Sequence, residues 1–135
     1  MSLMITPAYA GVLGLAFLAL SFRVVQGRRK LRVDLGDGGH RALMRRQRVQ
    51  ANFAEYVPLV LVLMTLAELQ GGRPWMIHLV GAALLLGRAL HGYGVSREPE
   101  PFVYRMVGMM LTFAALVIGA LVNLGLVNWT AFGTI

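Results

Sequence analysis

The chain has 135 residues, of which 57% are hydrophobic and only 14% are charged, and its formal net charge is +7. This composition excludes an average soluble domain and favours one integral membrane domain over residues 1–135. Because the cations do not belong to a soluble basic domain, nucleic-acid binding is disfavoured. The absence of cysteine excludes disulfides, a thiol nucleophile and thiolate metal sites. His40, His78 and His91 lie on separate segments, so we expect no metal site.

The first half of the chain predicts two membrane-spanning helices. Residues 3–22 carry no charge over a length that crosses about 30 Å of hydrocarbon, and no cationic segment precedes them as in a signal peptide. We therefore expect a retained first helix. A basic, glycine-rich connection follows at residues 26–40. The apolar run 56–67 is too short to cross unless it is extended through charged neighbours, which predicts a second helix from His40 to Gln70.

The second half of the chain predicts two further helices. The sequence GGRP at residues 71–74 indicates a tight turn. A third helix is expected from Trp75 to about Tyr93, and the two prolines of SREPEP (96–101) end it. Residues 106–135 are uncharged and long enough to span. The predicted fold is an all-α bundle of four transmembrane helices.

The distribution of cations predicts the orientation of this bundle. Nine of the 13 Lys and Arg residues fall between Arg23 and Arg48, and only Arg73 lies in the second connection. Three more flank the third connection, namely Arg88, Arg97 and Arg105. With four crossings, the first and third connections share a side, which the positive-inside rule places in the cytoplasm. Both termini are then expected outside.

Polar residues at the start of the second helix form a stripe along one face. They recur at intervals of four, three, four and three residues, as Arg41, Arg45, Arg48, Asn52 and Glu55. Gln50 lies off this stripe. Such groups must face protein or a water-filled cleft, because lipid would leave them unpaired. One interpretation is structural, with Glu55 paired to Arg48 or Arg88.

Polar groups of the other helices favour a binding site instead. Arg88, His91 and Tyr93 end the third helix, and Tyr104 and Arg105 begin the fourth, all at the level of the stripe. This set of cationic and hydroxyl groups exceeds what one glutamate can pair. We therefore expect a polyanionic ligand that also carries an amine for Glu55.

Three segments resemble those of the MAPEG family, the membrane-associated proteins of eicosanoid and glutathione metabolism. RVQANFAEYVP (48–58) is similar to the family signature R-x-x-x-N-x-x-E-x-x-P, and GRALHGYG (87–94) and PEPFVYRMVGMMLT (99–112) reinforce it. The family includes microsomal glutathione transferases and leukotriene C4 synthase. The resemblance covers essentially the whole chain and implies a homotrimer that binds glutathione between subunits near the cytoplasmic surface.

The resemblance also implies roles for individual residues. Arg48, Asn52, Glu55 and Tyr56 would contact glutathione, Gln50 would reach a neighbouring site, and Tyr93 would line the cleft. Arg105 matches the arginine that holds the thiolate and would be the catalytic residue. Arg88 and His91, at the same depth, complete the predicted glutathione site.

The predicted function is that of a membrane-bound glutathione transferase, or a peroxidase, acting on a hydrophobic electrophile or lipid from the bilayer. Glutathione has two carboxylates, one ammonium and one thiol, which suits several arginines and one glutamate. We expect glutathione as the co-substrate. We expect the protein in the inner membrane of a bacterium. A non-enzymatic lipid-binding or scaffold protein is the alternative. A transporter with Glu55 as proton relay is disfavoured, because the polar stripe does not cross the membrane.

Overall fold

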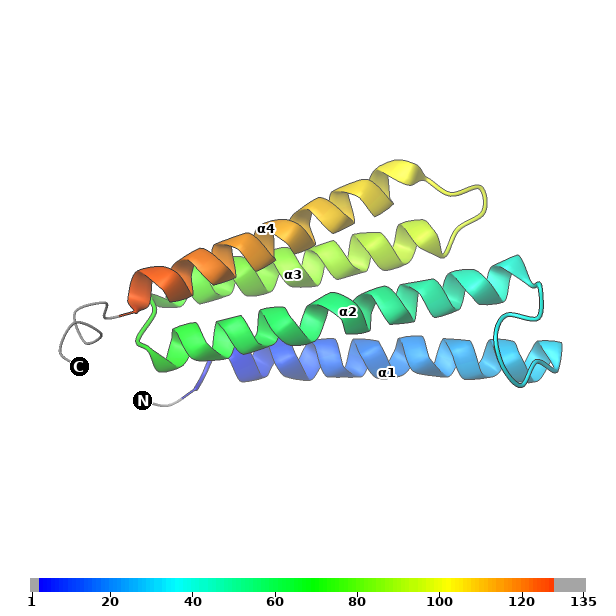
Figure 1. Ribbon diagram of the computed structural model, residues 1–135, viewed down its shortest axis with the longest axis horizontal. Helices are drawn as coiled ribbons and strands as arrows, with labels where there is room; N and C mark the ends of the chain where they lie inside the picture. The colour runs from blue at the N-terminus through cyan, green and yellow to red at the C-terminus, as the bar shows by residue number, and fades with distance from the viewer. Residues whose placement is uncertain (1–2, 128–135) are drawn as a thin grey trace, which may run out of the picture.

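The computed structural model describes residues 3–127, which form four long α-helices (Figure 1). The helices are α1 (Thr6–Leu31), α2 (Arg41–Leu69), α3 (Pro74–Val95) and α4 (Phe102–Leu126). They lie side by side and alternate in direction, with the α1–α2 and α3–α4 connections at one end and the α2–α3 connection at the other. Each helix is long and apolar enough to cross a membrane. The prediction of a four-helix membrane fold is confirmed.

The predicted bounds of α2 and α3 agree with the structure, and α1 ends within the basic segment 26–40, which was predicted to connect the first two helices. α1 continues past the apolar run 3–22 to Leu31, because loss of apolar character does not end a helix whose residues still favour one. It ends where Arg32 takes a left-handed conformation and Val33 N–H donates to the carbonyl of Arg28 at 3.0 Å. The predicted fourth segment, 106–135, extends beyond the described residues.

The interior of the bundle is largely apolar, with Arg88, His91 and Thr112 buried toward the basic end, and α1 packs mainly on α2 while α3 packs closely on α4. An added Cβ atom at Gly108 of α4 would lie 2.5 Å from the backbone nitrogen of His91 and 2.7 Å from the carbonyl oxygen of Gly87. The backbones of α3 and α4 are therefore in direct contact at this level. This contact fixes the polar end of α3 against α4.

At the end opposite the basic connections, the carboxylate of Glu68 fastens α2 to the start of α1. It accepts hydrogen bonds from the backbone N–H groups of Met4 and Ile5, each at 2.7 Å, and of Thr6 at 2.8 Å. The first N–H groups of a helix have no partner within the helix, and a negative charge there opposes the positive end of the helix dipole. Glu68 thus stabilises the entry of α1.

Candidate functional site

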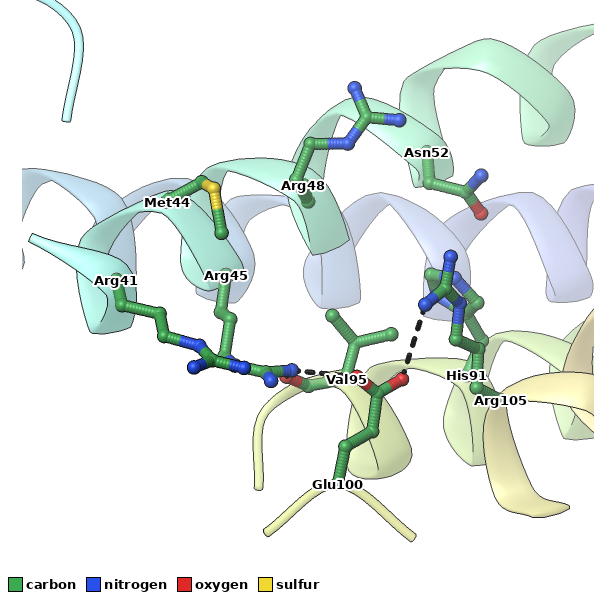
Figure 2. Close-up of a pocket in the computed structure, with 9 residues that line it drawn as sticks. All are labelled: Arg41, Met44, Arg45, Arg48, Asn52, His91, Val95, Glu100 and Arg105. Carbon is green, nitrogen blue, oxygen red and sulfur yellow. Dashed lines mark hydrogen bonds and ion pairs between the residues drawn. The ribbon is translucent and has the colours of Figure 1, made fainter. Parts of the chain in front are cut away.

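A polar cavity of about 200 Å³ lies at the basic end of the bundle, between α2, α3 and the start of α4 (Figure 2). We call it the arginine cavity. It is lined by Arg41, Met44, Arg45, Arg48, Asn52, His91, Val95, Glu100 and Arg105.

Helical spacing explains why these side chains meet. The first four polar positions of the predicted stripe, Arg41 to Asn52, line the cavity from α2, as their common face requires. α3 contributes His91 in its last turns, and α4 contributes Arg105 in its first turn. The structure therefore brings four of the predicted site residues, Arg48, Asn52, His91 and Arg105, to one cavity.

Two glutamates of the α3–α4 connection reach across to the arginines of α2. Arg45 Nε donates to Glu98 Oε1 and Arg45 Nη1 to Glu100 Oε2, both at 2.8 Å. Arg41 Nε lies 3.1 Å from the same oxygen of Glu98. The Arg45 side chain is only 12% exposed, so these pairs hold the connection firmly over the cavity.

Glu100 also links the cavity to α4, because Arg105 Nη1 lies 3.4 Å from Glu100 Oε1. The hydrogen bond from Arg45 and the positive charge of Arg105 hold the pKa of Glu100 below its usual range. The long distance and the 52% exposure of the Arg105 side chain leave most of this guanidinium free for another anion.

The arginine cavity keeps an excess of positive charge. Arg41, Arg45 and Arg105 share the carboxylates of Glu98 and Glu100, as described above. Arg48 forms no hydrogen bond or ion pair with any of residues 3–127, and its guanidinium projects away from Glu100 (Figure 2). A cavity with this charge attracts a negatively charged ligand.

Behind the cavity, Arg88 is buried and orients Asn52. Its Nη1 donates to Asn52 Oδ1 at 2.6 Å, and its Nε donates to Thr112 Oγ1 at 3.0 Å. Thr112 in turn donates to the carbonyl of Gly108 at 2.8 Å. Arg88 has therefore no carboxylate partner among the described residues, and the structural interpretation of the stripe, a pair between Glu55 and Arg48 or Arg88, was wrong.

Glu55 and Gln50 lie outside the arginine cavity of a single chain. Glu55 is exposed on α2 and makes no ion pair or hydrogen bond within the described range 3–127. Gln50 Nε2 donates to Ser21 Oγ of α1 at 2.9 Å, in keeping with its position off the stripe.

The two predicted tyrosines also pack elsewhere. Tyr56 lies edge-on to Phe113 of α4, with ring centroids 5.6 Å apart, and 5.9 Å from the guanidinium carbon of Arg88. Tyr93 packs edge-on against Tyr104 at 5.1 Å, with the guanidinium of Arg97 over its ring at 4.6 Å. These rings flank the buried arginine and the end of α3 and do not line the arginine cavity.

Sequence reasoning missed Glu100, Glu98 and Thr112. The segment SREPEP was interpreted only as a helix break, although its two carboxylates lie on the side that holds nearly all the cations. That imbalance was the available signal for Glu98 and Glu100. Thr112 gave no signal, because a single hydroxyl in an apolar helix most often bonds its own backbone.

The fold and the cavity together define a class of protein, a four-helix membrane protein with an arginine-lined cavity at its basic end. A family model described as the MAPEG family matches residues 6–125. The chain belongs to this family. It is also 38% identical over 126 residues to the inner membrane protein YecN of Escherichia coli K12. The aligned region covers 93% of this chain and 95% of YecN. YecN of E. coli O6:H1 matches with the same identity and the same coverage of both chains.

Proposed function

We propose that the protein is a membrane-bound glutathione transferase that presents the glutathione thiolate to a hydrophobic electrophile, including a peroxide that it would reduce. The arginine cavity carries this proposal, because its unpaired positive charge suits the two carboxylates of glutathione. Membership of the MAPEG family supports a glutathione-dependent or related membrane function.

In this proposal, Arg105 stabilises the thiolate. A free thiol with a pKa of about 8.5 is only a few per cent ionised at neutral pH. Lowering that pKa by about two units requires roughly 2.7 kcal/mol of extra stabilisation of the thiolate. A guanidinium that holds its own carboxylate at 3.4 Å, as Arg105 does, can turn to a second anion at small cost.

The proposed site is completed by a second copy of the chain in a homotrimer. Glu55 supports this arrangement, since an exposed carboxylate in a membrane helix, unpaired within the described part of its own chain, needs a partner. Glutathione bound between subunits would offer its ammonium to Glu55. Gln50, Tyr56 and Tyr93 would contribute from the surfaces around the cavity.

We place the protein in a bacterial inner membrane, with the basic connections in the cytoplasm and both termini outside. The name of the relative YecN supports the membrane. The first and third connections lie at one end of the bundle and carry nearly all the cations, which supports the orientation. Cytoplasmic glutathione would then reach the arginine cavity directly.

Detergent-purified protein titrated with glutathione tests the proposal, with absorbance followed at the thiolate band near neutral pH. We expect a thiolate signal that saturates with glutathione and is absent when S-methylglutathione, which lacks the thiol, is used. If calorimetry shows that glutathione binds but no thiolate signal appears, the protein binds glutathione without activating its thiol, and the transferase proposal is wrong.

The alternative function is that of a lipid-binding or scaffold protein of the same fold. The contact between Arg105 and Glu100 favours this alternative. An arginine that only holds the α3–α4 connection in place does not stabilise the thiolate of glutathione. The thiolate titration separates the two functions, since only the transferase ionises the bound thiol.

A further inference from the structure

A second cavity, of about 430 Å³, opens between α1 and α3 on the bundle surface. Its volume lies within the roughly 300–1,000 Å³ of typical ligand sites. We call it the α1–α3 groove. Its apolar wall includes Leu13, Leu20, Val49, Phe53, Leu85 and Ala89.

The groove exists because α1 makes few contacts with α3. Small residues face each other there, with Ala19 on α1 and Ala89 on α3, and both are exposed. Alanine side chains cannot fill the space that the packing of α1 on α2 leaves open. The groove is therefore open to the side of the bundle, where an acyl chain of the bilayer can enter.

The basic end of the groove is polar and cationic. Arg23, Ser96 and Arg97 line it there. A smaller hollow of about 180 Å³ adjoins it, shares Arg23 and Ser96, and adds Arg46. The apolar groove thus leads directly into a space for a polar headgroup.

Neither cation at the basic end of the groove has a carboxylate partner in the described chain, and the third arginine of its lining, Arg88, is the buried one that bonds Asn52 and Thr112. The side chain of Arg23 makes no hydrogen bond or ion pair, and Arg97 only covers the ring of Tyr93. Glu98 lines the adjoining hollow, but Arg41 and Arg45 already pair with its carboxylate. The groove therefore ends in two unneutralised guanidinium groups.

Ser96 gives a second, independent sign of a missing ligand. Its hydroxyl oxygen is buried and has no hydrogen-bond partner among residues 3–127. A buried hydroxyl without a partner costs free energy, which a ligand oxygen at this position would recover.

We propose that the α1–α3 groove binds an anionic phospholipid of the membrane, with an acyl chain along Leu20 and Phe53 and the phosphate at Arg23, Arg97 and Ser96. Basic pockets between membrane helices on the cytoplasmic side recognise such headgroups. The inference does not rest on the transferase, although Arg88, His91 and Tyr93 of the predicted glutathione site also line the groove and His91 lines both cavities.

Native mass spectrometry of the detergent-purified protein tests the proposal, with phosphatidylglycerol and phosphatidylcholine of identical acyl chains. We expect phosphatidylglycerol to bind at least roughly tenfold more tightly, because charge-assisted hydrogen bonds to the arginines are strong. The double variant Arg23→Gln/Arg97→Gln should lose this preference. The matched control Arg29→Gln/Lys30→Gln removes the same charge from exposed positions at the end of α1 and should keep it.

Two further variants make the result specific. Ala89→Phe fills the exposed side of the groove and should reduce binding of both lipids, while Arg48→Ala, in the arginine cavity, should leave lipid binding unchanged. Equal affinity for the two lipids, or equal loss in the Arg29/Lys30 control, would overturn the proposal in favour of general surface attraction. A change of assembly state in Ala89→Phe without loss of lipid would show that a second copy covers the groove.

Discussion

The guanidinium of Arg88 donates a 2.6 Å hydrogen bond to the side-chain oxygen of Asn52, so a buried cation on α3 sets the orientation of a cavity residue on α2. Among the described residues, only the neutral oxygens of Asn52 and Thr112 and the sulfur of Met109 accept its hydrogen bonds. Each accepted bond therefore bears strongly on the stability of the fold.

Asn52→Ala should lower the free energy of unfolding by about 1–3 kcal/mol, because it leaves a donor of a buried charge unsatisfied. Unfolding in detergent would measure this. Gln50→Ala, which loses one partly buried bond to Ser21, is the control and should cost less. In an Arg88→Met background the cost of Asn52→Ala should shrink, and an undiminished cost would show that Arg88 is not the reason for it.

Arg48→Ala and Glu55→Gln should each weaken glutathione binding by roughly tenfold or more, because each removes one charge-assisted contact to the ligand. Both side chains are exposed and have no partner in the described chain, so thermal stability without glutathione should stay unchanged. Isothermal titration measures the affinity. Full affinity in both variants would place the ligand elsewhere.

Arg105→Ala should separate chemistry from binding. We expect nearly full affinity for glutathione, while the pKa of the bound thiol rises toward about 8.5 and turnover near neutral pH falls by one to two orders of magnitude. Raising the pH should restore part of the rate. If the pH–rate profile of the variant overlays that of the parent protein, Arg105 only anchors Glu100.

The stability of the protein should fall in acid because of Glu100. Its pKa is lowered in the folded state by the hydrogen bond from Arg45, so it stabilises the fold fully above its unfolded value of about 4.3. This contribution is lost as the pH falls through the lower, folded pKa. Unfolding in detergent at a series of pH values should show a smaller decline for Glu100→Gln than for the parent, and equal declines would assign the effect to other groups.

Gly108→Ala should destabilise the bundle by about 1–3 kcal/mol, because the new methyl group meets the backbone of α3 and overpacks the interface. The intrinsic gain in helix propensity, about 1 kcal/mol, does not offset this strain. Gly11→Ala is the control, since an added Cβ there has nothing within 4 Å. A thermal unfolding series compares the two. If Gly11→Ala proves the more damaging, α1 contacts another chain at that point.

The sequence predicted the four helices from the lengths of their apolar runs, and it predicted the face of α2 that lines the arginine cavity from helical periodicity. It placed Arg48 and Asn52 with His91 and Arg105, since helix ends at one level must meet in an antiparallel bundle. It did not predict that Glu100 would enter the site, because the path of a connection depends on packing at both ends. Nor did it predict that Arg88 would bond Asn52 and Thr112, a choice set by the close contact of α3 and α4 at Gly108.

The three hydrogen bonds from the start of α1 to Glu68 join α1 to α2 at one end, and Arg46 and Gln50 of α2 join it at the other by donating to the carbonyl of Arg23 and to Ser21 Oγ. Both cavities lie toward the other end, where α1 touches α3 little and its last turns extend beside the α1–α2 connection. Because α1 is bonded to α2 near both of its ends, a motion that widens the space between α1 and α3 must carry α2 with α1 or break these bonds. A ligand that enters this space therefore meets a wall of two helices that are bonded together, and only α3 with its partner α4 is left to move away from it.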